Sequence, residues 1–189
     1  MYKSATTIDD IYRLALPSGT KLLAGEEFLQ RTVSWACSLR PSPPAFPKLD
    51  GNELALIDMD DLRKLGHQNR LEQVIVSLQT ARIAAIAVLG AVDSVAIQAA
   101  NSARITLFRL PDTEPTLQIE RSIIRLIVDR AGYVTQRSSD LQRELNQTAL
   151  TGGGMEKLAE HIHRFAQQPI VLLREDGQPM AVAGLEHSR

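Results

Sequence analysis

Short apolar runs alternate with segments of helical spacing over the first 112 residues, and this alternation constrains the fold more than any other feature. Residues 53–59 (ELALIDM) and 83–90 (IAAIAVLG) are apolar runs with the length and composition of buried strands. Between them, residues 68–81 place apolar side chains at helical spacing, and a helix over residues 94–103 precedes a third short strand in residues 105–111 (ITLFRLP). This order predicts an α/β domain with a mostly parallel or mixed sheet and flanking helices.

The N-terminal part of the chain adds a capped helix, two further strands and a proline-rich loop. Thr7 is the expected N-cap of a helix that ends before Pro17, because acidic residues in the first turn favour a helix N-terminus. A short strand at residues 22–23 leads through a turn into a second strand over residues 32–38. Residues 40–52 hold four of the nine prolines, and we expect them to form an ordered loop or an edge crossing.

Residues 116–150 change to a heptad pattern without proline or strand signals. Such a helix would extend roughly 50 Å, far more than is needed to cover a small sheet. We therefore expect one long helix that dimerises as a coiled coil, with small and polar seam residues that keep the coil weak. The expected seam consists of Ile124, Ile127, Ala131, Val134, Ser138, Leu141, Leu145 and Thr148.

Residues 151–189 have the pattern of the start of another domain. TGGG at residues 151–154 breaks the helix, and a new helix over residues 155–167 precedes two apolar runs joined by Asp176-Gly177, a strong hairpin signal. Two strands and one helix are too few to bury a stable core, so we expect a truncated α+β unit. The predicted domains are therefore 1–115, 116–150 and 151–189.

Composition excludes several classes of function. The net charge is -1, from 21 basic and 22 acidic residues, so no global field draws the chain to nucleic acid or to an anionic membrane. Cys37 is the only cysteine, which excludes an internal disulfide and a multi-cysteine metal site. The N-terminus is polar and the apolar runs are shorter than a membrane span, so we expect a cytosolic protein.

Four segments, taken in order, resemble the N-terminal domain of the PucR family, the purine-catabolism type of bacterial transcription regulator. They are LLAGEEFLQRTVSWACSL, DGNELALIDMDDL, RIAAIAVLG and ITLFRLP, and the resemblance covers residues 5–112. Gly25, Val33, Trp35, Glu53 and Leu54 stand at matching places in a hydrophobic framework that has no catalytic signature. The helix, the glycine break and PIVLLREDGQPMAVAG resemble the family's linker and the start of its GAF-like domain.

The resemblance implies a regulator rather than an enzyme, with no cofactor. It implies a homodimer that responds to a small-molecule effector, a purine or ureide-like metabolite, and that binds DNA through a helix-turn-helix end not present in this chain. Residues 36–39 (ACSL) and 58–61 (DMDD) depart from the family's pattern. If these turns line the ligand site, the ligand differs from that of other members.

Polar residues at both ends of the 53–59 strand are candidate ligand contacts. Asp58 and Asp60, beside Asp61, follow the strand where open α/β sheets place ligands, and such carboxylates can hold Mg²⁺ or a cationic ligand. A solvated turn that caps the next helix is, however, the role we expect for them. Asn52 directly precedes the strand and Glu53 begins it, and either a structural hydrogen bond or a ligand contact accounts for them.

Two further candidates are Trp35 and Arg40. Trp35 could stack on a planar ligand, although core packing is the expected role, and Arg40 with the proline-rich loop forms either a lid or a surface crossing. Cys37 is expected to be a buried, inert thiol. His161 and His163 are two residues apart on a predicted helix and diverge, so we expect no metal site.

The leading hypothesis is a ligand-sensing and dimerising module that transmits a change through the 116–150 helix to an output domain. The alternative is an assembly domain that binds no ligand, and a ligand pocket rather than a filled core separates the two. A small hydrolase that uses Cys37 or the aspartates is a third reading, but no nucleophile, base and acid arrangement and no phosphate loop supports it.

Overall fold

The computed structural model describes residues 5–66, 70–166 and 168–184, and it divides into two compact units, Met1–Arg130 (unit 1) and Ala131–Arg189 (unit 2). The first two residues of the helix expected over 68–81 and the last residue of the helix expected over 155–167 lie outside the described residues. Among the helices that are described, none is both long enough and apolar enough to cross a membrane.

The first helix, α1 (Ile8–Leu14), begins at a capping box. The Asp10 N–H donates to Thr7 Oγ1 at 3.2 Å, and the Thr7 N–H donates to Asp10 Oδ2 at 3.0 Å. These reciprocal bonds satisfy two backbone donors at the start of the helix. The N-cap predicted at Thr7 is therefore confirmed.

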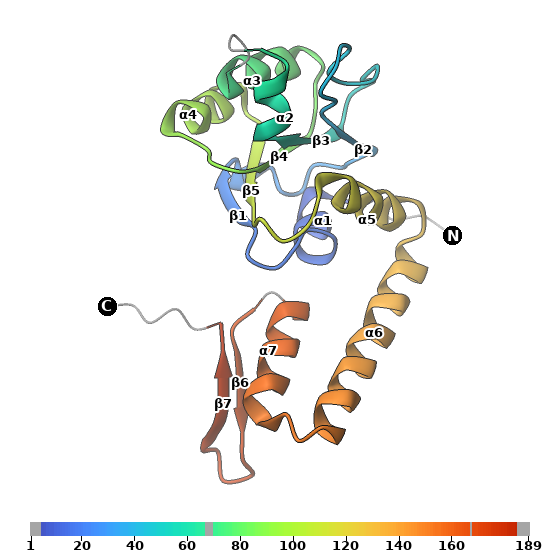
Figure 1. Cartoon of the computed structure of the whole chain (residues 1–189), viewed down its shortest axis with the longest axis vertical. Coiled ribbons are helices and arrows are strands. Elements are labelled where there is room, and N and C mark those ends of the chain that lie inside the picture. The colour runs from blue at the N-terminus through green and yellow to red at the C-terminus, as the bar shows by residue number, and fades with distance from the viewer. Residues whose placement is uncertain (1–4, 67–69, 167, 185–189) are drawn as a thin grey trace. The chain divides into compact units, whose positions relative to one another are not determined.

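Unit 1 is built on one five-stranded sheet, in which four neighbouring strands are parallel and one edge strand is antiparallel (Figure 1). The strand order is β1-β5-β4-β3-β2, and β1 is the antiparallel edge strand. The strands are β1 (Lys21–Ala24), β2 (Trp35–Ser38), β3 (Glu53–Asp58), β4 (Ala85–Leu89) and β5 (Thr106–Leu110). The α/β class and the mixed sheet predicted from the sequence are confirmed.

Helices cover both faces of this sheet (Figure 1). α2 (Met59–Lys64), α3 (Leu71–Thr80) and α4 (Ser94–Ala103) lie on one face, and α3 packs against α4. α5 (Thr116–Val128) packs against β2 and β3 on the other face, where it also contacts α1. The alternating strands and helices of the sequence therefore form a three-layer unit.

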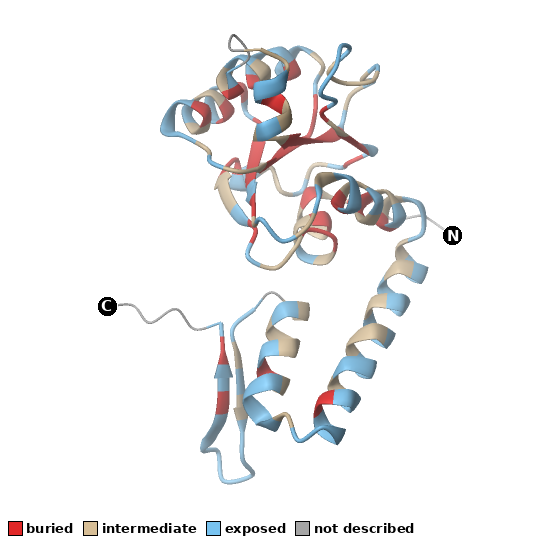
Figure 2. Cartoon of the chain, viewed as in Figure 1, coloured by how far each residue is buried: buried red, intermediate tan, exposed pale blue. Residues whose placement is uncertain are grey.

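The core of unit 1 lies on both sides of the central strands, as Figure 2 shows. Ala55 and Ile57 belong to the apolar cluster beneath α3 and α4. Leu54 and Leu56, which alternate with them along β3, are also fully buried, because successive side chains of a strand point to opposite faces. The prediction of a buried strand in ELALIDM is confirmed, with the strand ending at Asp58.

The single long helix predicted over residues 116–150 is wrong. The structure has two helices, α5 and α6 (Arg130–Leu150), separated at Asp129, whose φ of -139° and ψ of 76° are not helical. α5 buries one apolar face on the sheet, whereas α6 is polar around most of its circumference and buries only Thr148 among its residues. Burial therefore fixes α5 but not α6, and aspartate between them is a poor helix former.

Unit 2 contains most of α6, together with α7 (Gly154–Ala166) and a hairpin of β6 (Ile170–Leu173) and β7 (Pro179–Ala183). Gly177 takes a φ of +83° in the connecting turn, and the predicted hairpin is confirmed. α7 packs on one face of the hairpin. The buried core there consists of Ala159, Ala181 and Ala183, which is a small core for a unit of this size.

Candidate functional site

A groove of about 490 Å³ opens at the carboxyl ends of β3 and β4 and is the candidate ligand site of unit 1. α2, the start of α3 and the segment from β4 into α4 form its walls. Its volume falls within the range of small-molecule sites, and open α/β sheets bind ligands at the carboxyl ends of their strands. The lining residues are Met59, Leu62, Arg63, Arg70, Leu71, Glu72, Ala91, Val92, Asp93 and Val95.

Two aspartate caps and one glycine shape the walls of this groove. Asp58 accepts a hydrogen bond from the Asp60 N–H at 2.8 Å, so α2 begins directly at the end of β3. Asp93 accepts from the Ala96 N–H at 2.8 Å and starts α4. Gly90 has a φ of +111°, and a Cβ there would lie 3.0 Å from Met59 Cβ, so glycine lets the turn after β4 pack closely on α2.

The groove has an apolar floor and an ionisable rim. Leu62 and Leu71 are buried beneath it. The rim contains two cations and two carboxylates, namely Arg63, Arg70, Glu72 and Asp93. Sequence reasoning missed these four residues. Their position in the segments that follow β3 and β4 was the one signal in the sequence, but it does not tell which of the residues in those segments share a groove.

The structure does not bring the six predicted ligand residues together. Trp35 pairs in register with Glu53 at the amino ends of β2 and β3, next to Asn52. Asp58 is instead the last residue of β3, and Arg40 and Asp60 follow the carboxyl ends of β2 and β3. A strand rises about 3.3 Å per residue, so roughly 16 Å separates the two groups along β3. None of the six residues lines the groove.

Glu53 holds the turn that leads into β3. Its side chain is buried, and it accepts hydrogen bonds from the Asp50 N–H at 2.6 Å and the Gly51 N–H at 2.9 Å. Of the two roles considered from the sequence, the structural hydrogen bond is the one observed. Asn52 is exposed and has a φ of +65°, which asparagine tolerates better than most residues.

The aspartates after β3 cap α2 and form ion pairs on it. Asp60 lies 2.6 Å from Arg63, and Asp61 lies 2.7 Å from Lys64, where its carboxylate raises the pKa of the lysine. With the Asp58 cap, each carboxylate already has a local partner. Among the described residues, no group of histidine, cysteine and acidic side chains could hold a metal ion.

Trp35 is 46% exposed, so the expected core packing is wrong. It is the first residue of an edge strand, where one side of the chain has no neighbouring strand. Arg40 is also exposed, and its N–H donates to the Ala45 carbonyl at 2.8 Å. Ala45 and Phe46 pack against the core cluster, so the proline-rich loop is an ordered surface crossing in this structure.

The Cys37 thiol is buried, and burial raises its pKa to about 12, with nearby Glu120 and Glu53 adding to the effect. Because only the thiolate reacts with iodoacetamide, we expect alkylation of the folded chain at pH 7 to be at least about tenfold slower than in urea. Mass spectrometry over time measures both rates. Equal rates in the two conditions would contradict a buried, protonated thiol and would return Cys37 to the list of reactive groups.

The comparison with known families decides the class of the chain. Residues 10–127 match the purine catabolism regulatory protein-like family, PucR. The chain belongs to this family. The matched residues lie within unit 1 and extend almost to the end of α5, so the family resemblance is confirmed for the α/β unit of this PucR-family chain. A search of curated proteins gave no match.

In this PucR-family chain, the predicted seam is divided among three environments. Ile124 and Ile127 are half-buried on α5, and Ala131, Val134 and Ser138 are exposed on α6. Leu141 and Leu145 are half-buried, and Thr148 is buried. Leu141 lines a hollow together with side chains of α7. Leu141 of the seam therefore faces a helix of the same chain, which heptad spacing alone could not reveal.

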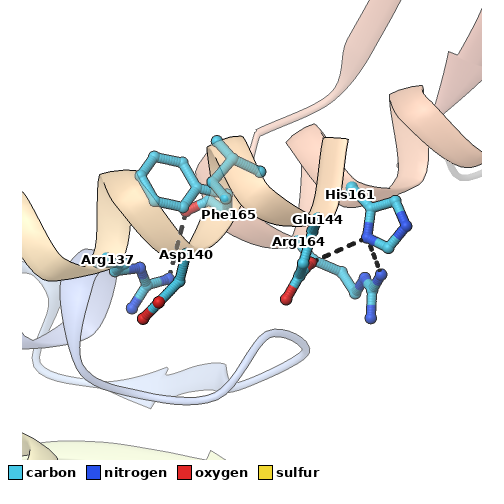
Figure 3. Close-up of a pocket in the computed structure, with 7 residues that line it drawn as sticks. Arg137, Asp140, Glu144, His161, Arg164 and Phe165 are labelled. Atoms are coloured by element: carbon cyan, nitrogen blue, oxygen red, sulfur yellow. Dashed lines mark hydrogen bonds and ion pairs between the residues drawn. The ribbon is translucent and has the colours of Figure 1, made fainter. Parts of the chain in front are cut away.

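That second hollow, of about 200 Å³, lies between α6 and α7 and is lined by ionisable side chains (Figure 3). His161 Nδ1 lies 3.0 Å from Glu144 Oε2, and Arg164 approaches the same ring nitrogen. Arg137 donates to the Phe165 carbonyl at 3.3 Å. These groups engage one another across the two helices, so the cluster links α6 to α7 within unit 2.

Proposed function

We propose that unit 1 is the sensing domain of a transcription regulator and that its groove binds a small metabolite of purine breakdown. Membership of the PucR family supports the regulatory role, and the groove at the ends of β3 and β4 is the observation that carries ligand sensing. In this proposal the protein is a cytoplasmic, bacterial regulator, and residues 151–189 are GAF-like. DNA binding would belong to a helix-turn-helix domain outside these residues.

Contacts of α5 and α1 offer a path from the sheet to the start of α6. Ser38 Oγ of β2 donates a short hydrogen bond to Glu120 of α5. Arg130, the first residue of α6, pairs with Asp10 of α1 at 2.6 Å. Asp10 is also part of the capping box, so a shift of α1 or α5 would be transmitted to Arg130. Ligand binding would act by favouring one of two packings of these helices.

Dimerisation through α6 is the second part of the proposal, and Ser138 tests it. Ser138→Leu is expected to tighten the dimer by about tenfold or more, because a leucine buried at a coiled-coil seam adds apolar contact where a polar residue stood. Ser139→Leu is the matched control, since Ser139 is exposed on the same helix but lies outside the seam. Sedimentation equilibrium measures both variants, and equal association constants would refute the seam.

The ligand half of the proposal is tested by native mass spectrometry and calorimetry on the purified chain. We expect a dimer, with added mass if a metabolite co-purifies. We also expect saturable binding of at least one compound among xanthine, urate, allantoin and allantoate. Failure of all four to bind, with no co-purified mass, would overturn metabolite sensing.

An assembly role without ligand is the second candidate function, and one feature of unit 2 favours it. The face of the hairpin opposite α7 exposes four large apolar side chains, Val171, Leu173, Met180 and Val182. Such a contiguous apolar face is typical of interaction surfaces. If the chain associates without ligand, and Val171→Ser with Val182→Ser abolishes association, assembly is the better description.

A further inference from the structure

We propose that the groove of unit 1 selects a small carboxylate that also carries N–H donors, such as a ureido or amino acid. This inference rests on the proposed function, which makes the groove the effector site. It goes further by naming the ligand's chemistry from the side chains that line the groove. A ligand that suits these side chains is a compact molecule that carries one anionic group and several hydrogen-bond donors.

Two arginines form the anionic half of the proposed recognition. Arg70 directly precedes α3, its side chain makes no cap bond to that helix, and no ion pair among the described residues engages it. Arg63 pairs with Asp60, whose side chain is 76% exposed, so a ligand can replace that partner at little cost. The planar fork of an arginine matches a carboxylate with two parallel hydrogen bonds.

Two carboxylates of the groove would recognise the hydrogen-bond donors of the ligand. Asp93 uses Oδ1 to cap α4, which leaves its second oxygen to accept a hydrogen bond from a ligand. Glu72 lies half-buried in the first turn of α3 and also lines the groove. Ionised carboxylates only accept, so both select N–H or O–H groups. They would also repel a second negative charge on the ligand.

The balance of charge around the apolar floor excludes other ligand classes. Two cations and two anions on the rim disfavour a polyanion such as a nucleotide, because the carboxylates would face its phosphates. A purely apolar ligand would cover Arg70 and Glu72 without offering either of them a polar partner. A compact, polar monoanion that covers Met59, Leu62 and Val92 suits both the apolar floor and the ionisable rim.

The test compares acids with their neutral, cyclised partners by calorimetry on the full chain. Allantoate and hydantoate carry a carboxylate and ureido groups, whereas allantoin and hydantoin keep the N–H donors but lack the carboxylate. We expect at least one acid to bind about tenfold or more tightly than its cyclic partner. Its affinity should also fall as ionic strength rises, because the contact is an ionic one near the surface.

Variants assign the effect to the groove. Arg70→Ala should weaken binding of the acid by about tenfold or more, which is the loss expected for one charge-assisted contact. Glu72→Gln, made on its own, should also weaken binding of the acid. Lys64→Ala is the matched control. This substitution also removes one positive charge, but Lys64 lies on α2 and does not line the groove. It should change the affinity less than twofold.

Each outcome separates this inference from the proposed function. Neutral partners that bind as tightly as the acids, or an acid whose affinity is unchanged in Arg70→Ala, would overturn the carboxylate requirement and leave metabolite sensing intact. Binding of xanthine or urate but of neither acid would have the same meaning. Failure of every compound to bind would overturn both.

Discussion

Replacing Gly25 with alanine is expected to lower the free energy of unfolding of unit 1 by about 3 to 5 kcal/mol. Gly25 connects β1 to the following turn with a φ of +75°, a backbone conformation that residues other than glycine rarely adopt. A Cβ at this position would lie 2.7 Å from Thr106 Cα and 2.9 Å from the Ile105 carbonyl oxygen. Both atoms belong to the backbone, so the clash cannot be relieved by a change of rotamer.

The same approach explains why the turn is fixed in place. Thr106 Oγ1 is buried and donates to the Gly25 carbonyl oxygen at 3.1 Å, so the turn is bonded to the start of β5. Moving the backbone to admit a Cβ would break this bond and leave a buried hydroxyl unsatisfied. The loss should therefore exceed what an unfavourable φ alone produces.

Gly19→Ala is the control that isolates the clash. Gly19 also belongs to unit 1 and has a φ of +90°, but a Cβ there would lie 3.9 Å from Pro111 Cβ, an ordinary contact. It should lose only about 1 to 2 kcal/mol, the usual cost of the left-handed conformation. Urea unfolding followed by Trp35 fluorescence reports unit 1, because Trp35 is the only tryptophan. Equal losses in the two variants would show that the close approach to Thr106 has no energetic weight.

Local signals allowed much of unit 1 to be predicted. Thr7 and Asp10 carry a capping box within four residues, and the apolar runs of β3, β4 and β5 are long enough to be recognised as buried strands. The helices between them follow from spacing alone. These features depend on residues that are near one another in sequence, and the five-stranded sheet confirms the α/β class that they indicated.

The groove and the interruption at Asp129 could not be predicted because they depend on tertiary contacts. Heptad spacing continues through Asp129, but burial of Ile119 and Ile123 on the sheet acts on α5 alone. Arg70 and Asp93 are 23 positions apart in number and meet at one groove only because β3 and β4 are adjacent and parallel. Trp35 is exposed because β2 lies at the sheet edge, and the sequence does not reveal strand order.

The second large effect is expected at Phe108, which fills the face of the sheet that carries α1. Phe108 is fully buried in β5 and stacks on Tyr12, with ring centroids 5.0 Å apart. Phe108→Ala should lower the free energy of unfolding by about 3 to 5 kcal/mol, because it removes a large apolar side chain and leaves a cavity. Tyr12 would keep its hydroxyl contact with the Thr20 carbonyl, which limits how far the site can collapse.

Arg109→Ala is the control for Phe108, since Arg109 is the next residue of β5, is exposed and points to the other face. It should change the free energy of unfolding by less than about 0.5 kcal/mol. Phe108→Leu should fall between the two, because leucine fills part of the volume. The same urea titrations measure all three. If Phe108→Ala lowers the free energy of unfolding no more than Arg109→Ala does, this stacking does not hold α1 on the sheet. The proposed coupling from Asp10 to Arg130 would then have no fixed starting point on the sheet.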